Sequence, residues 1–278
     1  MNFLITGGTG SFGQAYVRHL LDNSPAERIC VFSRDEWKQA QMRQAFNDDP
    51  RLRFFIGDVR DFTRLTRAMI GVDVVIHAAA LKRIEVGNYC PDEMVKTNIN
   101  GSSNVIEAAY VAKVHSVVAL STDKAWQSLS PYGQSKALAE SLFLNANHVF
   151  GESGPNFSVT RFGNVWGSTG SVVPAWKNFI SKGIKKVPVT DPDCTRFFMR
   201  KEEAVELVSC SVGKRELIIP SNLLAYRIGD LAEAMNVEMD IKGLPEWEKK
   251  HEGLRDGYTS DQAKRMSVEE LCEVLKHG

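Results

Sequence analysis

The chain contains 278 residues, of which 43% are hydrophobic and 24% are charged, so it can bury one large core or two modest ones. Its 34 basic residues balance its 34 acidic residues, which argues against nucleic acid or an anionic membrane as a partner. The sequence shows no signal-peptide pattern and no apolar run of membrane-spanning length. We therefore expect a cytoplasmic protein that acts on a small molecule.

The cysteines are odd in number and far apart, and none forms a CxxC or Cys/His pair at metal-ligand spacing. We expect reduced, mostly buried thiols and no metal site. The five are Cys30, Cys90, Cys194, Cys210 and Cys272.

Apolar runs of strand length alternate with segments of helical periodicity through the first 161 residues. This alternation predicts βαβ units and a parallel sheet, and the nearly uniform apolar composition of the runs predicts helices on both faces. The expected fold class is therefore α/β, a doubly wound parallel sheet of the Rossmann type. The predicted strands are 3–6, 29–32, 52–56, 72–77, 114–120 and 157–161, and three of the predicted helices are 12–21, 36–46 and 97–112.

The rhythm changes after about Arg161 to loops rich in glycine and proline with short helical pieces between them. We expect a dinucleotide-binding Rossmann domain at 1–165, followed by a smaller substrate-binding lid. Residues 197–222 are predicted to return to the main sheet as a helix and a strand. The smaller domain would then consist of 166–196 and 223–278.

A glycine turn follows the first predicted strand and opens the first predicted helix, with Gly7, Gly10 and Gly13 spaced as GxxGxxG. Glycine at these points permits a tight turn, close backbone approach to a pyrophosphate, and close packing of helix on strand. The helix N-terminus offers free N–H groups to the anion. We predict that this turn binds a nicotinamide dinucleotide through Gly7, Thr9, Gly10, Ser11, Phe12 and Gly13.

The residues after the second strand bear on the choice of cofactor, since an acidic side chain there suits the ribose of NAD and a basic one the 2′-phosphate of NADP. Ser33 and Arg34 come first, and an arginine fork suits a phosphate, so NADP is favoured, with Lys38 as a helper. Asp35, also predicted at this site, and Glu36 keep NAD open.

Two further segments are predicted to line the cofactor. Asp58 and Val59 follow the third strand, where a carboxylate can bind the adenine amino group. Ala78, Ala79 and Ala80 follow the fourth strand and keep the side chains small where a backbone must pass the cofactor.

A tyrosine and a lysine, Tyr132 and Lys136, lie four residues apart at the start of a predicted helix and hence on one face. A nearby ammonium lowers the pKa of a tyrosine and lets the phenolate act as a base toward a substrate hydroxyl. The fifth strand then ends in Ser121-Thr122-Asp123-Lys124, which places an acid and an amine at the carboxyl edge of the sheet, where such sheets hold ligands.

Together these motifs resemble the extended short-chain dehydrogenase/reductases, and more narrowly the inverting UDP-N-acetylglucosamine 4,6-dehydratases of bacterial surface-sugar pathways. Ser121-Thr122-Asp123-Lys124-Ala125 discriminates best, because retaining dehydratases are expected to carry Asp-Glu at 123–124 and simple C4 epimerases neither pair. The other matching stretches are 5–13, 32–36, 57–61, 77–82, 96–99, 132–136, 161–165 and 195–197.

The resemblance implies a mechanism in three stages. Tyr132 takes the proton of the sugar 4-hydroxyl while hydride leaves C4, and Lys136 assists it. Lys124 then removes the acidified C5 proton and Asp123 protonates the departing 6-hydroxyl. Hydride returns to C6 and a proton adds to C5 from the opposite face, so that the cofactor is regenerated. Thr122 is implied to hydrogen-bond the 4-hydroxyl.

The resemblance also implies a UDP-sugar as substrate, a homo-oligomeric state, and a substrate-side set of Lys82, Asn164, Val172, Thr190 and Arg196; Lys82 is counted with the cofactor set as well. The chain departs from the family at Trp126–Pro131, at Trp166, and at 245–252. In that last stretch Pro245 replaces an arginine expected to face the diphosphate, and the sugar end of the pocket is expected to differ.

Two other readings of the sequence remain open. A nucleotide-sugar C4 epimerase or 4-keto reductase needs the cofactor, Tyr132 and Lys136 but has no use for the Asp123–Lys124 pair. A non-catalytic NADP-binding sensor or scaffold needs only the glycine turn.

Overall fold

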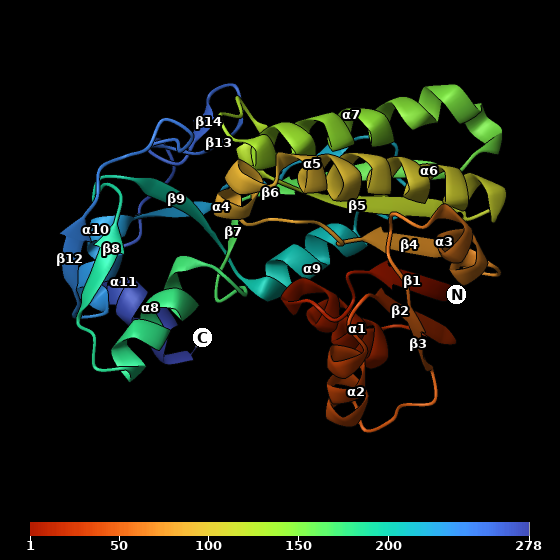
Figure 1. The fold of residues 1–278 in the computed structure, drawn as a ribbon, viewed down its shortest axis with the longest axis horizontal. Helices are drawn as coiled ribbons and strands as arrows, with labels where there is room; N and C mark the ends of the chain where they lie inside the picture. Colours follow the sequence, from red (N-terminus) through yellow and green to blue (C-terminus); the bar gives the residue numbers. More distant parts are fainter. Residues whose placement is uncertain (278) are drawn as a thin grey trace.

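A sheet of seven parallel strands forms the centre of the computed structural model, which describes residues 1–277 (Figure 1). The strand order is β10-β6-β5-β4-β1-β2-β3, so successive connections leave β1 in opposite directions and create a switch point between β1 and β4. The strands are β1 (Asn2–Thr6), β2 (Arg28–Ser33), β3 (Leu52–Ile56), β4 (Val74–His77), β5 (Ser116–Thr122), β6 (Asn156–Phe162) and β10 (Leu217–Ile218).

Helices cover both faces of this sheet, as the apolar strands require. One face carries α1 (Ser11–Asn23), α2 (Glu36–Ala45) and α9 (Lys201–Ser209). The other carries α3 (Phe62–Met69), α4 (Ile84–Tyr89), α5 (Pro91–Met94), the π-helical stretch η1 (Val95–Asn100), α6 (Gly101–Val111) and α7 (Pro131–Phe150). The expected doubly wound α/β fold is thus confirmed.

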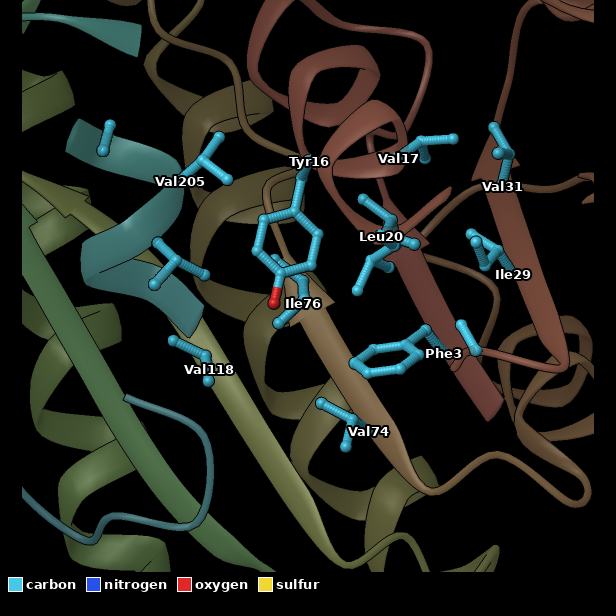
Figure 2. Packing of buried hydrophobic residues seen from close by; sticks show 14 of the residues in the cluster. Phe3, Tyr16, Val17, Leu20, Ile29, Val31, Val74, Ile76, Val118 and Val205 are labelled. Carbon is cyan, nitrogen blue, oxygen red and sulfur yellow. The ribbon is translucent and has the colours of Figure 1, made fainter. Parts of the chain in front are cut away.

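The core beneath α1 shows why the sequence folds this way (Figure 2). Tyr16, Val17 and Leu20 of α1 recur at helical spacing and are at most 3% exposed. They pack against alternate residues of the strands, such as Phe3 and Ile76, while the intervening strand residues pack against the helices of the other face.

A smaller lobe stands at the carboxyl edge of the sheet (Figure 1). It contains a three-stranded sheet, a two-stranded sheet and a hairpin, together with three helices around a separate apolar core. Its elements are β7 (Asn164–Val165), α8 (Val172–Ser181), β8 (Lys186–Val189), β9 (Thr195–Met199), β11 (Leu224–Arg227), α10 (Ile228–Ala234), β12 (Glu238–Ile241), β13 (Gly253–Arg255), β14 (Tyr258–Thr259) and α11 (Val268–His277).

One segment leaves the smaller lobe and lies against the main sheet. Helix α9 packs on α1, and β10 pairs in parallel with β6. Strand β9, in contrast, pairs with β7 and β11 in the three-stranded sheet. The structure therefore places the returning segment at Lys201–Ile218, and residues 197–199 lie in the smaller lobe.

The five cysteines are free thiols, but only Cys30 and Cys194 are buried. The expectation of mostly buried thiols was wrong because Cys90 and Cys210 lie at the ends of α4 and α9, where the chain faces solvent. Within residues 1–277, no helix is both long and apolar enough to cross a bilayer.

A buried ion pair joins α7 to β6. The Arg161 Nε and Nη2 atoms donate to the two carboxylate oxygens of Glu140 at 2.9 and 2.5 Å, and Nη1 donates to the Leu254 carbonyl at 2.6 Å. Glu140→Ala leaves this guanidinium buried without its anion, so we expect it to lower the free energy of unfolding by about 3–5 kcal/mol in urea titrations. Glu233→Ala, on the exposed side of α10, serves as the control. Equal midpoints for the two variants would contradict the assignment.

Candidate active site

The glycine turn after β1 forms a cradle without side chains. Gly7 has a φ of +66°, and a Cβ there would lie 2.8 Å from the backbone nitrogen of Ala79. A Cβ at Gly13 would lie 2.5 Å from the Cα of Gly8, so helix α1 packs directly on the turn. Gly10 is the N-cap of α1 and offers no side chain to its first N–H groups. These N–H groups are left for an anion, which fits the pyrophosphate of a dinucleotide.

The ends of β2 and β3 bring the predicted adenosine-side residues together. Arg34 is largely exposed, and its Nη1 lies 3.8 Å from a carboxylate oxygen of Asp58. Asp35 is the N-cap of α2, since its Oδ1 accepts the backbone N–H of Lys38 at 3.0 Å. The Ser33 hydroxyl accepts a hydrogen bond from Gln39. The carboxylate of Asp35 is thus engaged by its own helix, while the guanidinium of Arg34 remains accessible.

The loop after β4 is fixed by a residue that the sequence reasoning did not single out. Asn98 accepts the N–H of Leu81 at 2.8 Å and donates to the Leu81 carbonyl and to the Ser135 hydroxyl at 2.9 Å each. It thereby joins the loop of Ala78–Lys82 to the first turns of α7. Its position within the Lys96–Ile99 motif was the available signal.

Helix α7 presents Tyr132 and Lys136 together, both buried. Pro131 is the first helical residue, and the N-cap Ser130 accepts the N–H of Gly133 at 3.2 Å. Burial lowers the pKa of Lys136 to about 8 and raises the pKa of Tyr132 to about 12. Opposing that rise, the charge of Lys124 and a hydrogen bond with Thr122 lower the pKa of the Tyr132 phenol. The charge of Lys124 thus acts on the Tyr132 phenol. The effect of Lys136 that the spacing suggests stays a prediction.

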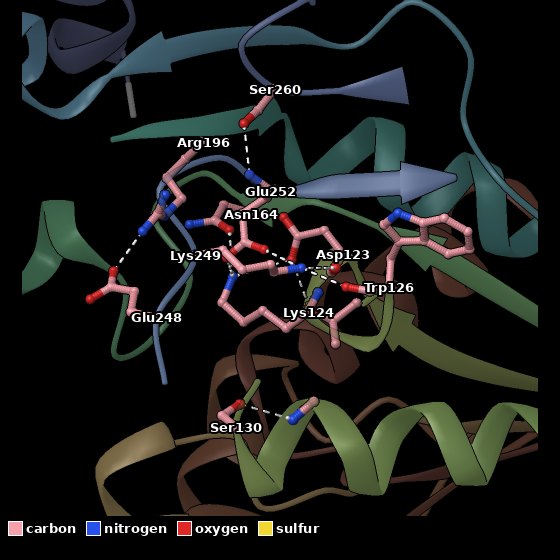
Figure 3. A network of polar contacts seen from close by, with 12 residues as sticks. Asp123, Lys124, Trp126, Ser130, Asn164, Arg196, Glu248, Lys249, Glu252 and Ser260 are labelled. Carbon is pink, nitrogen blue, oxygen red and sulfur yellow. Dashed lines mark hydrogen bonds and ion pairs between the residues drawn. The ribbon is translucent and has the colours of Figure 1, made fainter. Parts of the chain in front are cut away.

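The acid and amine predicted at the end of β5 lie in a short 3₁₀ turn, η2 (Asp123–Ala125). The Nζ atom of Lys124 lies 3.2 Å from Asp123 Oδ1, 3.4 Å from Asn164 Oδ1 and 3.1 Å from Glu252 Oε1 (Figure 3). The Lys124 side chain is 21% exposed. The predicted pair of Asp123 and Lys124 is thus assembled. The side-chain oxygen of Asn164 on β7 and the carboxylate of Glu252 from the C-terminal region join it.

Asp123 lies wholly inside the protein. Its Oδ1 accepts hydrogen bonds from the Thr122 hydroxyl at 3.0 Å and from Lys124. Its Oδ2 has no hydrogen-bond partner among the described residues and lies beside Gly163. Burial raises the pKa of Asp123, and the neighbouring Lys124 opposes that rise. A carboxyl in this setting favours holding a proton more than a surface aspartate does.

The C-terminal segment before β13 contributes charged groups that the sequence reasoning missed. Lys249 donates from Nζ to the carbonyls of Asp123 at 3.1 Å and Trp126 at 2.7 Å, and its Nζ lies 2.9 Å from Glu252 Oε2 (Figure 3). The charged run from Glu248 to Glu252 was visible in the sequence. Nothing in it indicated that these residues would fold back onto η2, more than 120 positions earlier.

The predicted substrate-side residues occupy different places. Asn164 touches Lys124, whereas Val172 begins α8 and Thr190 follows β8, both in the smaller lobe. Lys82 lies exposed in the loop after β4, where desolvation and the neighbouring Arg83 lower its pKa. Arg196 on β9 is 6% exposed and forms an ion pair with Glu248 at 2.5 Å. Its Nη1 donates to two carbonyls, so contact with a diphosphate requires exchange of these partners.

Trp126 and Trp166, which depart from the family pattern, both pack against neighbouring side chains or backbone. Trp126 packs against Gly253, where a Cβ would come within 2.7 Å of the indole, and the Arg161 guanidinium lies 5.7 Å from its ring centroid. Trp166 packs against the rings of Phe198 and Tyr226 at centroid distances of 5.2 and 5.8 Å. Trp126 thus secures the C-terminal segment, and Trp166 extends the core of the smaller lobe.

A doubly wound sheet with an uncapped glycine turn, a buried Tyr/Lys pair on α7 and an acid–base turn after β5 defines an extended short-chain dehydrogenase/reductase. The chain belongs to the family described as polysaccharide biosynthesis protein, whose model matches residues 3–270.

Two proteins of known activity and one solved structure are similar to this chain over most of its length. The inverting UDP-N-acetylglucosamine 4,6-dehydratase of Campylobacter jejuni is 46% identical over 256 residues, which cover 90% of this chain and 76% of that protein. A UDP-glucose 4-epimerase of Rickettsia bellii is 37% identical, and the match covers 98% of this chain and 94% of that protein. The crystal structure of Pen from Bacillus thuringiensis superposes with a TM-score of 0.93 at 33% identity and covers 100% of this chain and 98% of that one.

Proposed function

We propose that this chain is an inverting nucleotide-sugar 4,6-dehydratase acting on UDP-N-acetylglucosamine, the reaction of its Campylobacter relative. One observation carries the proposal. A buried carboxyl and an amine, Asp123 and Lys124, lie 3.2 Å apart beside the Tyr132 phenol. A reaction limited to oxidation at C4 requires only Tyr132 among these groups. Elimination of water requires an acid and a base in addition.

The proposed first stage uses Tyr132 as the base toward the sugar 4-hydroxyl. The charge of Lys124 favours the phenolate, against the burial that disfavours it. Lys136, whose pKa is about 8, is still mostly charged at neutral pH and can hold a ribose hydroxyl. A nicotinamide cofactor held by the glycine turn and by Lys136 would supply the hydride acceptor for C4 and the hydride donor for C6.

The proposed second stage uses Lys124 and Asp123. Transfer of one proton along the hydrogen bond from Lys124 Nζ to Asp123 Oδ1 produces a neutral amine and a protonated carboxyl. The amine can take the C5 proton, and the carboxyl can donate its proton to the departing 6-hydroxyl. Asp123 has no exposed surface, and its Oδ1 is bonded only to Thr122 and Lys124 among the described residues. A proton leaving it therefore passes through one of these two groups.

NADP is the proposed cofactor. The arrangement of Arg34 and Asp35 supports it, because the guanidinium is accessible and the carboxylate caps α2. Arg34→Ala is expected to weaken binding of NADP by roughly 10–100-fold, the cost of a charge-assisted hydrogen bond, and to leave NAD binding nearly unchanged. Titration calorimetry with both dinucleotides measures this difference. An equal loss for both would assign Arg34 to a part of the site that the two cofactors share.

Product analysis separates the dehydratase from the epimerase, which the Rickettsia relative makes the second candidate. Purified protein is incubated with UDP-N-acetylglucosamine, and the product is examined by mass spectrometry. The dehydratase product has lost one water, whereas an epimer has the mass of the substrate. An unchanged mass with a new sugar configuration would transfer the proposal to the epimerase.

The chain is also proposed to act in the cytoplasm as a homo-oligomer. Helices α6 and α7 frame a largely apolar groove that includes Ile106, Leu138 and Val149, a surface suited to a second copy. Light scattering at micromolar concentration tests this, and Leu138→Glu is expected to favour the monomer. A monomeric wild-type protein would remove the proposal.

A further inference from the structure

The carboxylate of Glu252 forms an ion pair with Lys124 and has no role in the reaction proposed above. It is 2% exposed and reaches the cluster from the C-terminal segment. Its Oε1 lies 3.1 Å from Lys124 Nζ, closer than Asp123 Oδ1 at 3.2 Å, and its Oε2 lies 2.9 Å from Lys249 Nζ.

The backbone holds Glu252 firmly in this position. Its N–H donates to the Ser260 hydroxyl at 2.9 Å, and Ser260 in turn donates to the Thr195 carbonyl at 3.1 Å. The next residue, Gly253, packs under Trp126. Figure 3 shows Glu252 at the centre of the network, between Lys124 and the strands of the smaller lobe.

We propose that Glu252 is a positioning residue for Lys124, which orients its amine and stabilises the ammonium that forms when Lys124 takes the C5 proton. This inference rests on the proposed function. A neutral amine that accepts a proton from carbon becomes a cation, and that cation develops 3.1 Å from a fixed anion. The C5–H bond breaks, its electron pair remains on the sugar, and the proton moves to Nζ, so no further reactant is needed. A buried carboxylate beside a catalytic histidine acts in a comparable way in serine proteases.

The charges around Glu252 keep it ionised throughout. Lys124, Arg196 and Lys249 together lower its pKa to about 2, against the effect of burial. The charged and titratable groups facing it are Lys124 and Asp123 of η2, Tyr132 of α7, Arg196 of β9 and Lys249 of its own segment. Its negative charge raises the pKa of Lys124 and makes the amine a stronger base.

Glu252→Gln tests the charge at nearly constant shape. Exchange of deuterium from solvent into C5 is followed by NMR as a function of pH, and the absorbance of reduced nicotinamide in a single turnover reports oxidation at C4. We expect C5 exchange to slow by about 10²–10⁴-fold, as when a comparable buried carboxylate is neutralised. The acidic limb of the pH profile for C5 exchange should move to lower pH by about one to three units, because the charge that raises the pKa of both members of the Asp123–Lys124 pair is lost. Formation of reduced nicotinamide should remain within about threefold of wild type, well below a tenfold change in rate.

Two companion variants separate charge from anchoring. Glu252→Asp retains the anion and should recover part of the exchange rate and the original position of the limb. Ser260→Ala removes the hydrogen bond to the backbone N–H of Glu252 and leaves its charge, so any loss of rate should occur without movement of the limb. An unmoved limb in Glu252→Gln overturns the inference. Absence of C5 exchange in the wild-type protein would instead overturn the proposed function.

Discussion

Lys124→Ala is expected to abolish dehydration and leave cofactor binding intact. Lys124 contacts Asp123, Asn164 and Glu252, whereas the glycine turn is formed by other parts of the sheet edge. General acid–base groups contribute about 10²–10⁴-fold, so turnover should fall by at least that factor. Product formation is measured by chromatography, and dinucleotide affinity by calorimetry.

The control for this variant is Lys96, a surface lysine that forms two ion pairs, as Lys124 does. Lys96 pairs with Asp92 and Glu93 at 3.0 and 2.7 Å and is about half exposed, so Lys96→Ala should retain full turnover. Lys124→Ala removes the cation that Asp123 and Glu252 share, which destabilises the folded protein. Thermal unfolding is therefore measured together with activity. Full turnover in a folded Lys124→Ala protein would remove Lys124 from the role of base.

Gly133→Ala is expected to reduce turnover by about 10²-fold or more, because displacements near 1 Å at a catalytic group have effects of this size. An added Cβ at Gly133 would overlap the carbonyl oxygen of Lys124 and lie 2.8 Å from Ser128 Cβ. The obstacle is backbone, so either the η2 turn or the start of α7 must move. The change thereby separates Tyr132 from the acid–base pair without removing a functional group.

Turnover and cofactor affinity measured together test this prediction. Affinity for the dinucleotide should change little, since Gly133 has no contact with the glycine turn among its three nearest neighbours. Gln134→Ala, one position later on the exposed side of α7, should behave as the wild type. If Gly133→Ala retained normal turnover, the close approach of η2 to α7 would not be required for catalysis.

The sequence predicted the main sheet well because each of its strands is a local apolar run. The helices of both faces follow from spacing within ten to twenty residues, as in α1. The candidate site residues could be picked out for the same reason, since Thr122–Lys124 and Tyr132–Lys136 each form one short motif at a strand end or a helix start. Their catalytic roles stay a prediction.

Contacts that depend on distant segments could not be predicted in this way. Glu252 meets Lys124, and Arg196 meets Glu248, only after the smaller lobe has folded. The charge of Lys124 acts on the Tyr132 phenol across η2 and α7, and the local spacing of Tyr132 and Lys136 gave no sign of this. The ionisation of a cluster likewise depends on every charge that the fold brings to it.

One measurement addresses the central claim, that Asp123 and Lys124 carry out an elimination with inversion. Purified protein is incubated with UDP-N-acetylglucosamine in deuterated water, and the product is examined by NMR. The account predicts a 4-keto-6-deoxy sugar nucleotide with deuterium at C5 and inverted configuration at that carbon. Unchanged substrate, or a product that retains its C5 hydrogen, would contradict it.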